Sequence, residues 1–320
     1  MKIYIAGHNG MVGSAILRLL KKNKEIKIIV KDRYELDLTN QKKVQNFFKN
    51  EKPDQVYMAA AKVGGVYANT MYPAEFIYQN TMMSANIINS SFLNNVKKIL
   101  FLGSSCIYPK VAQQPLVEEE LLNGKLEPTN EFYAISKILG IKICQSFNRQ
   151  YGESHNIDYR CIMPANLYGP NDNYDLKNCH VIPALIRKFH EAKIKKEKQV
   201  IIWGTGKPKR EFLHVDDLAK ACIYIMNLDK DKYIHLSKPN FFLNVGTGSD
   251  LTIKQLTFKI KKTVGFEGEI IFDKKQPDGI TRKLLNVRRI QKAGWKHKIK
   301  LENGLKKTYN DFKKKVKLSF

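Results

Sequence analysis

The 320-residue chain is 43% hydrophobic and 10% aromatic, which is typical of a globular protein with one large domain or two closely associated ones. Its formal net charge of +25 raises the question of a nucleic-acid partner. Most of the basic residues, however, are lysines scattered through every segment, a distribution that indicates a solvated surface and argues against nucleic-acid binding.

The N-terminus and the cysteines point to a reducing cytoplasm. Residues 2–7 are a short apolar run that ends in a glycine loop, which is the pattern of a buried strand and not of a signal peptide. No apolar run approaches the about 20 residues that a membrane-spanning helix needs. The 5 cysteines include no Cys-x-x-Cys pair, so neither a disulfide framework nor a structural metal site is indicated.

The first expected strand runs into a glycine-rich turn. Gly7, Gly10 and Gly13 follow a Gly-x-x-Gly-x-x-Gly spacing, and a helix with periodic apolar residues begins directly after them. Glycines in this context allow a tight turn and a close approach of the backbone to a ligand, while the helix N-terminus offers N–H groups to a pyrophosphate. The sequence therefore predicts a dinucleotide-binding site here.

The second expected strand, residues 26–30, ends where the adenosine ribose of such a cofactor is recognised. Asp32 favours NAD, because an acidic side chain at this point accepts a hydrogen bond from the 2′-hydroxyl group. Lys31 and Arg33 flank it, and two cations suit the 2′-phosphate of NADP. The residues leave both cofactors open, and we favour NADP(H).

The rest of the first half alternates between strands and helices. This alternation predicts an α/β fold, a Rossmann-type doubly wound parallel sheet with its ligand site at the carboxyl ends of the strands. The expected segments are a helix at 41–50, a strand at 56–61, a loop beside the cofactor phosphates at 62–66, a helix at 73–94, a strand at 98–103, a helix through 133 to 151 and a strand at 159–164.

One turn of the helix that ends at residue 151 carries a Tyr-x-x-x-Lys pattern. Tyr133 and Lys137 are four residues apart, so their side chains leave the same face of the helix. An ammonium group beside a phenol stabilises the phenolate, and should lower the pKa of Tyr133 toward the working range of a proton donor or acceptor. The Ser104 segment lies at the same edge of the expected sheet.

The pattern changes after Gly169, and the second half reads as a smaller mixed α/β domain that covers the substrate. We place a Rossmann dinucleotide-binding domain at residues 1–168, with returning segments near 212–246, and a mainly substrate-binding domain at 169–320. The elements expected in it are a polar loop at 171–177, a helix at 181–192, a strand at 200–204, a helix at 218–227 and a lysine-rich tail at 306–320 that frays.

Five long strings occur in a fixed order along the chain: AAKVGG at 60–65, FLGSSCIYPK at 101–110, LEPTNE at 126–131, HVIPAL at 180–185 and REFLHVDD at 210–217. Together they resemble the extended short-chain dehydrogenase/reductase family, and within it the enzymes that make GDP-L-fucose. The resemblance runs from Gly7 to about Phe312. Several ordered matches of this length are far more specific than any single motif.

The resemblance implies an activity and its residues. Enzymes of this kind epimerise C3 and C5 of GDP-4-keto-6-deoxy-D-mannose and then reduce C4 with NADPH. By position, Ser104, Tyr133 and Lys137 correspond to the reducing triad, in which the tyrosine protonates the developing alkoxide, the serine binds the same oxygen and the lysine holds the ribose. Cys106 and His180 correspond to the pair that exchanges protons at C3 and C5.

The resemblance also implies the binding residues and a homodimer, in which the helices at 73–94 and 133–151 pack across a four-helix interface. Asn9 stands where relatives often carry Arg, so that Lys31 and Arg33 would supply the charge for a 2′-phosphate. The residues implied for NADP(H) are Gly7, Asn9, Gly10, Met11, Val12, Gly13, Lys31, Arg33, Asp37, Leu38, Ala60, Leu102, Gly103, Ser104, Tyr133, Lys137, Pro164, Asn166, Leu167 and His180. Those implied for the GDP-sugar are Ser105, Cys106, Asn166, Lys188, Trp203, Arg210, Asp278 and Lys283.

Other functions remain open on the sequence. An enzyme that only reduces C4 of an already epimerised GDP-4-keto hexose or heptose could keep all the catalytic residues. A nucleotide-sugar 4-epimerase with tightly bound NAD would use Tyr133 and Lys137, but it gives no role to Cys106 and His180. A 4,6-dehydratase is less favoured, because the chain lacks the acidic pair expected after Ser104. A non-catalytic Rossmann protein that binds a cofactor or polyanions would not need the Tyr133 and Lys137 pair.

Overall fold

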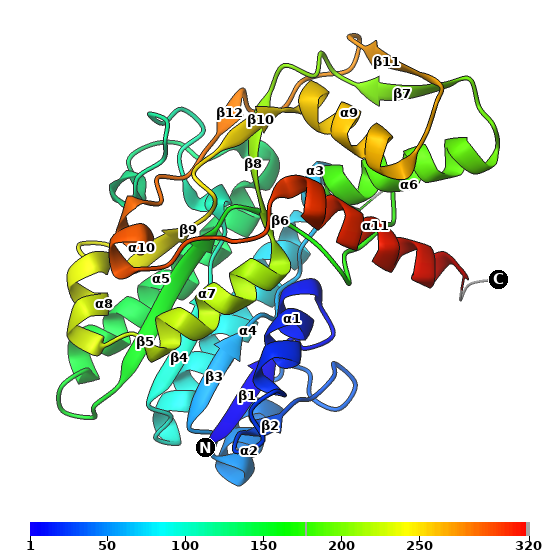
Figure 1. The fold of residues 1–320 in the computed structure, drawn as a ribbon. Helices are drawn as coiled ribbons and strands as arrows, with labels where there is room; N and C mark the ends of the chain where they lie inside the picture. The colour runs from blue at the N-terminus through cyan, green and yellow to red at the C-terminus, as the bar shows by residue number, and fades with distance from the viewer. Residues whose placement is uncertain (177, 318–320) are drawn as a thin grey trace.

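The computed structural model describes residues 1–176 and 178–317, and its centre is a parallel sheet of six strands (Figure 1). The strands lie in the order β2-β1-β3-β4-β5-β9, and every neighbouring pair is parallel. The doubly wound sheet predicted from the sequence is therefore confirmed. The bounds are β1 Lys2–Ala6, β2 Lys27–Ile29, β3 Gln55–Met58, β4 Lys98–Leu102, β5 Asp158–Pro164 and β9 Phe242–Val245.

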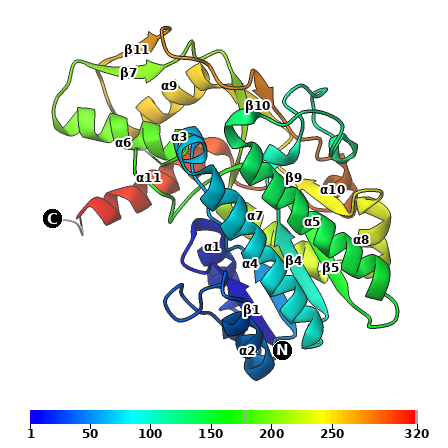
Figure 2. The same cartoon turned by 180° about the vertical axis from the view of Figure 1, so that it is seen from behind.

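These strands read as apolar runs because helices cover both faces of the sheet. Helices α1 (Met11–Leu20) and α7 (Val215–Asn227) pack together over one face. Figure 2 shows α4 (Pro73–Leu93) and α5 (Glu131–Tyr151) side by side over the other face. All 7 residues of β5 are buried, as expected for a strand enclosed on both faces, where no alternating pattern is needed.

The order of the strands reverses at β1, which has β2 on one side and β3 on the other. In an open α/β sheet, ligands bind outside the carboxyl ends of the strands at such a reversal, because the connecting loops diverge there and leave a crevice. Gly7 directly follows β1, and Ala60 lies shortly after β3. The glycine-rich turn is thus located at the point where the topology favours a ligand.

The second half of the chain builds a layer above the carboxyl ends of the sheet (Figure 1). It encloses a second hydrophobic core, separate from the core around the central sheet. One small sheet contains β10, β8, β12 and β6, and a second pairs β7 with β11. The bounds are β6 Asn166–Tyr168, α6 Val181–Ile194, β7 Gln199–Trp203, β8 Lys209–His214, β10 Asp250–Thr252, α9 Ile253–Val264, β11 Glu269–Asp273, β12 Arg282–Lys283 and α11 Leu301–Lys317.

Shorter elements complete the chain, and some of them were not predicted. Helix α3 begins at the last residue of the loop expected at 62–66 and covers residues for which we predicted no element. Strand β8 likewise precedes α7 in a stretch to which we assigned no element. Among the described residues, no helix has the length and apolar character needed to cross a membrane. The shorter elements are α2 Gln41–Glu51, α3 Val66–Met71, α8 Lys230–Ser237, α10 Arg288–Ala293 and 3-10 turns at Ser105–Ile107, Glu118–Glu120 and Pro128–Asn130.

The prediction that the lysine-rich tail frays is wrong for residues 306–317. Helix α11 places Leu305, Tyr309 and Phe312 in the second core, at the spacing that lines one face of a helix. The lysines between them lie on the solvent side, so that their abundance hid an amphipathic pattern. The remaining residues of the predicted tail, 318–320, lie outside the described residues.

We therefore expect Phe312→Ala to destabilise the protein by about 3–5 kcal/mol, because it removes a ring that is buried in the second core. The free energy of unfolding, measured by denaturant titration, checks this. Lys314→Ala changes an exposed neighbour on the same helix and should leave stability within about 0.5 kcal/mol. A Phe312→Ala protein as stable as its parent would show that the helix does not dock.

Candidate active site

The glycine-rich turn forms a cradle that leaves no space for side chains. Gly7 has a φ angle of +81°, and a Cβ atom on it would lie 2.6 Å from the backbone of Ala60. A Cβ atom on Gly13 would collide with the carbonyl of Gly7. Helix α1 begins at Met11 with no side-chain cap, so its first N–H groups face this cradle. Such a turn suits a pyrophosphate, which needs close backbone approach and N–H donors.

Two of the three charged residues directly after β2 make contacts within the segment, and the third is exposed. The ammonium of Lys31 pairs with Glu35 at 2.7 Å, and the carboxylate of Asp32 accepts hydrogen bonds from the N–H groups of Tyr34 and Glu35 at 2.8 and 2.9 Å. Asp32 is therefore engaged as a turn residue. Arg33 is exposed, so its guanidinium is the better placed of the two predicted cations to meet a 2′-phosphate.

Ser104, Tyr133 and Lys137 come together at the carboxyl end of β4. Lys137 is buried, and its ammonium donates to the carbonyl of Leu102 at 2.9 Å while lying 5.8 Å from the centre of the Tyr133 ring. The side chain of Ser104 lies near the hydroxyl of Tyr133 and acts as a hydrogen-bond donor that favours the ionised phenol. Phe76 packs edge-on against the tyrosine ring at 6.1 Å. Helix α5, β4 and α4 thus fix the orientation of the phenol together.

The protonation states differ from the expectation drawn from the sequence. We predicted that Lys137 lowers the pKa of Tyr133, but burial outweighs that effect and raises the pKa of Tyr133 above its usual value, with the hydrogen bond from Ser104 opposing the rise. Burial lowers the pKa of Lys137 to about 8. The phenol is therefore neutral near pH 7, which is the form needed to donate a proton to an alkoxide, and the lysine is still charged.

Cys106 lies in the turn after β4, two residues beyond Ser104. Its N–H donates to the hydroxyl oxygen of Ser104 at 3.3 Å, so the turn is closed by the serine side chain. Two donors reach its sulfur: the amide of Asn130 at 3.6 Å and the ammonium of Lys283 at 3.8 Å. The half-buried thiol is thus held between the first turn of α5 and β12.

His180 is the residue that precedes helix α6. The residue is exposed at the surface, yet desolvation by the surrounding protein lowers the pKa of the imidazole below its usual value of about 6.5. A neutral imidazole with access to water can exchange protons with solvent. The carbonyl of the neighbouring Asn178 accepts a hydrogen bond from the N–H of Gly65 at 3.0 Å, which joins this segment to the loop at 62–66.

The residues predicted to bind a GDP-sugar form a wall in the second half of the chain. Arg210 and Lys283 are paired neighbours on β8 and β12. Arg210 also donates to the carbonyl of Ile280 at 2.5 Å, and burial lowers its pKa from the usual range. Asp278 is exposed and accepts hydrogen bonds from the N–H and hydroxyl of Thr205 at 2.9 and 2.5 Å, which fixes the loop beside this wall.

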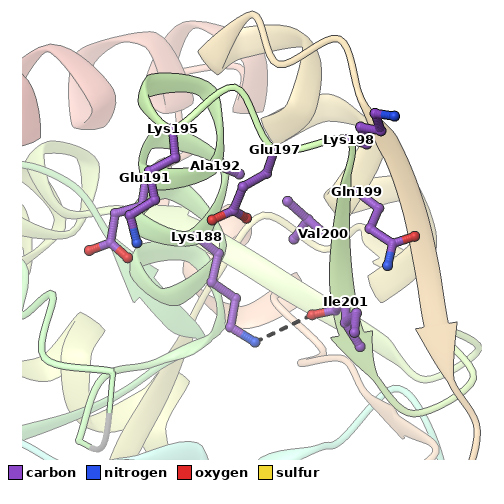
Figure 3. A pocket seen from close by; sticks show the side chains of 9 residues that line it. All are labelled: Lys188, Glu191, Ala192, Lys195, Glu197, Lys198, Gln199, Val200 and Ile201. Atoms are coloured by element: carbon purple, nitrogen blue, oxygen red, sulfur yellow. Dashed lines mark hydrogen bonds between the residues drawn. The ribbon is translucent and has the colours of Figure 1, made fainter.

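Lys188 and Trp203 lie at the outer end of the wall. The ammonium of Lys188 sits 5.7 Å from the centre of the Trp203 ring. It also donates to the carbonyl of Ile201 at 3.5 Å (Figure 3). The Trp203 residue is 68% exposed, so it does not have the core role that is common for tryptophan. A cavity of about 510 Å³ opens beside Lys188, between α6 and β7, but none of the triad residues lines it.

The other predicted cofactor residues also lie at the carboxyl edge of the sheet. The carbonyls of Asn9 and Leu38 accept hydrogen bonds from Asn171 and Asn86 at 3.1 and 3.0 Å. Asn166 donates to the carbonyl of Glu211 at 2.8 Å, which connects this edge to β8. Gly10, Met11 and Val12 form the start of α1, and Asp37 lies in the segment after β2. Gly103 follows β4 directly, and Ser105 is buried in the turn after it. Pro164 and Leu167 flank the junction of β5 with β6.

Two residues at the centre of the site were not predicted. Phe76 contacts the Tyr133 ring, and Asn130 contacts the sulfur of Cys106. Asn130 lies inside one of the strings that carried the family resemblance, three residues before Tyr133, and this spacing was a usable signal. Among residues 1–176 and 178–317, no group of three or more His, Cys, Asp or Glu residues could hold a metal ion.

A Rossmann-type sheet whose carboxyl edge carries a glycine cradle, a Tyr and Lys pair and a serine defines a dinucleotide-dependent enzyme of the reductase and epimerase class. The chain belongs to the NAD dependent epimerase/dehydratase family, whose model matches residues 3–236. The membership in the extended short-chain dehydrogenase/reductase family that the sequence predicted is thereby confirmed.

The chain is similar over nearly its whole length to characterised enzymes. It is 54% identical to the GDP-L-fucose synthase of Escherichia coli (strain K12), over 97% of this chain and 96% of that protein. A GDP-6-OMe-4-keto-L-xylo-heptose reductase from Campylobacter jejuni has 40% identity and a TM-score of 0.92, over 98% of each chain. A GDP-mannoheptose C4 reductase from the same organism, with NADP bound, has 42% identity and a TM-score of 0.88, over 98% of each chain.

The lowered pKa of Lys137 predicts how cofactor binding depends on pH. The ammonium is charged below about pH 8 and loses its charge as the pH rises through that value, so the affinity for NADPH should fall by at least about 10-fold between pH 7 and pH 10. Titration of NADPH fluorescence at each pH checks this. Lys137→Met should bind weakly with no such step, and a wild-type affinity that is constant from pH 7 to pH 10 would contradict the assignment.

Proposed function

We propose that the protein is an NADPH-dependent reductase of a GDP-4-keto-6-deoxy sugar that also epimerises C3 and C5. One observation carries the proposal: Ser104 contacts both the phenol of Tyr133 and the turn of Cys106, so a proton donor for C4 and a thiol for its neighbours flank a single position. A 4-epimerase or a non-catalytic binding protein has no use for that thiol.

The residues support the reduction step in a simple way. NADPH, when bound, supplies the hydride for C4. Tyr133 is neutral and donates its proton to the oxygen that becomes an alkoxide, while Ser104 donates a hydrogen bond to the same oxygen and lowers the barrier by stabilising its charge. Lys137 uses one of its three N–H groups on Leu102 and keeps the others for the ribose hydroxyls.

The cradle and the charges support NADP(H) as the cofactor. The backbone of Gly7 and Gly13 fits a pyrophosphate, because any side chain there would fill the space that the phosphates need. Arg33 supplies a cation for the 2′-phosphate in place of the arginine that relatives often carry at the position of Asn9. The similar GDP-mannoheptose C4 reductase from Campylobacter jejuni has NADP bound.

The epimerisation step needs a base and an acid on opposite faces of the sugar ring. The 4-keto group acidifies the protons on C3 and C5, because the charge left on the carbon spreads to the keto oxygen. Cys106 and His180 come from different elements, the turn after β4 and the start of α6, and could approach the ring from two sides. Ser104 and Tyr133 stabilise the enolate oxygen as they stabilise the alkoxide.

Residues 169–320, which we assign mainly to a substrate-binding domain, carry side chains that suit a nucleoside diphosphate sugar. Arg210 and Lys188 are cations for the diphosphate, and the exposed ring of Trp203 is available to pack on the base or the sugar. The similarity to a GDP-L-fucose synthase favours a hexose, and the similarity to GDP-heptose reductases supports reduction alone as the second candidate.

A homodimer in the cytoplasm completes the proposal. Helix α5 exposes Phe132, Ile135 and Leu139, at the spacing of one helix face, and the neighbouring α4 exposes Tyr78. Large apolar side chains gathered on two adjacent helices favour burial against a second copy. Two such pairs would form a four-helix interface across a two-fold axis.

Proton exchange tests the catalytic proposal. In D2O with GDP-4-keto-6-deoxy-mannose, the protein should incorporate deuterium at C3 and C5 even without NADPH, because Cys106 and His180 act before reduction. NMR of the recovered sugar measures this. Cys106→Ser and His180→Gln should reduce exchange at least about 100-fold, and Cys106→Ser should leave NADPH affinity unchanged. Reduction of the substrate without exchange at either carbon would leave the second candidate, a C4-reductase alone.

The interface is tested separately. Ile135→Glu places a charge in the centre of the apolar stripe, so it should convert a dimer into a monomer at micromolar concentration. Light scattering after size exclusion measures the mass. Lys262→Glu, a charge change at an exposed position on α9, a helix that packs on α6 and α11, serves as the control. A wild-type protein that is monomeric at high concentration would refute this part of the proposal.

A further inference from the structure

The side chain of Asn130 does not cap helix α5, although its position before the helix favours that role. Asn130 is the residue just before α5, where an asparagine commonly accepts a hydrogen bond from an N–H group of the first helical turn. Here it makes no such bond. Its amide nitrogen instead donates to the sulfur of Cys106 at 3.6 Å, and its oxygen is buried with no hydrogen-bond partner among the described residues. The side chain of Asn130 therefore contacts Cys106 in the active site instead of capping helix α5.

Positively charged side chains also lie near the sulfur of Cys106. The ammonium of Lys283 lies 3.8 Å from the sulfur atom. Arg210, the strand neighbour of Lys283, is close enough for the charge of Cys106 to act on it. A negatively charged sulfur accepts hydrogen bonds more strongly than a neutral one and is attracted to cations, so all of these groups favour the thiolate over the thiol.

We propose that Asn130 and Lys283 are positioning residues that hold Cys106 as a thiolate, which makes Cys106 the base of the proposed epimerisation. The inference rests on the proposed function for its role in turnover, but the thiolate itself is a property of the free protein. It also gives Lys283 a task beyond the substrate contact implied by the family resemblance.

The proton transfer balances as follows. The thiolate forms an S–H bond with the proton of C3 or C5, the C–H bond breaks, and its electron pair moves into an enolate whose charge rests on the C4 oxygen near Ser104 and Tyr133. His180 takes up a proton from solvent and donates it, as imidazolium, to the opposite face, so that it returns to the neutral form. The S–H group of Cys106 releases its proton to solvent, which restores the thiolate. No oxidant or reductant takes part in this exchange.

The orientation of the amide decides the sign of its effect. With the nitrogen toward the sulfur, Asn130 stabilises the thiolate; with the oxygen toward it, the side chain would accept the thiol proton and stabilise the neutral form. The ammonium of Lys283 on the same sulfur favours the first arrangement, because both groups then donate to one acceptor. Removal of Asn130 therefore has opposite consequences in the two cases.

Alkylation by iodoacetamide measures the thiolate directly, on the full-length protein without substrate. The other thiols give little background near pH 7, since Cys144, Cys161 and Cys222 are buried and burial raises the pKa of Cys179 to about 11. Mass spectrometry of the peptide that contains Cys106 follows the reaction. The rate at pH 7 divided by the rate at pH 10 reports the thiolate fraction and corrects for changes in access.

We expect this ratio to fall about 3–10-fold in Asn130→Ala and about 10-fold or more in Lys283→Met, because each variant loses one donor to the sulfur. Asn130→Asp has the same size and can still begin a helix, but it places a carboxylate beside the sulfur, so its ratio should fall furthest. Thr129→Ala alters an exposed residue in the same turn that does not touch Cys106, and it should leave the ratio unchanged.

An unchanged ratio in both Asn130→Asp and Lys283→Met would overturn the proposal, and so would a higher ratio in Asn130→Ala. Thermal unfolding of each variant identifies a merely structural role, which would lower stability without moving the ratio. Deuterium exchange at C3 and C5 should fall in parallel with the ratio. If the wild-type protein shows the thiolate but no exchange, the proposed epimerisation fails while the assignment of Asn130 and Lys283 stands.

Discussion

The structure depends on how one buried charge is satisfied. Lys137 lies in the interior, and a buried ammonium is costly unless it finds acceptors. It reaches the carbonyl of Leu102, the last residue of β4, and thereby fixes helix α5 against the end of that strand. Tyr133 lies one turn earlier on the helix and Asn130 just before its start, so one contact sets the position of both side chains relative to the turn that carries Cys106. The reaction centre is built from this alignment.

The opposite wall of the site is held by a buried carboxylate. Glu211 accepts hydrogen bonds from the N–H groups of Leu285 at 2.9 Å, Gly248 at 2.7 Å and Thr247 at 2.5 Å, so it joins β8 to two separate stretches of chain. Its neighbour on the same strand is Arg210, which pairs with Lys283 of β12. Burial raises the pKa of Glu211, and the backbone hydrogen bonds oppose that rise because they replace part of the hydration that the carboxylate loses. The hydrogen bonds of Glu211 thus fix the backbone of the strand that carries Arg210.

The central sheet and the triad could be predicted because their signals are local: apolar runs, a glycine spacing and two residues one helical turn apart. The protonation of Tyr133 could not, because it depends on burial by Phe76 and other residues distant in sequence. The same holds for the contacts of Asn130 and Lys283 with Cys106, which join parts of the chain that no sequence period relates. The docking of α11 was missed because its lysines concealed the spacing of Leu305, Tyr309 and Phe312.

The most direct test of the account is the stoichiometry of a single turnover with and without the phenol. With enzyme in excess over GDP-4-keto-6-deoxy-mannose, the wild-type protein should consume one NADPH per sugar and yield a C4 alcohol, and Tyr133→Phe should slow this step by about 100-fold or more while binding NADPH normally. Oxidation of NADPH by Tyr133→Phe at the wild-type rate, or a wild-type protein that converts the sugar without consuming NADPH, would contradict a reduction centred on this tyrosine.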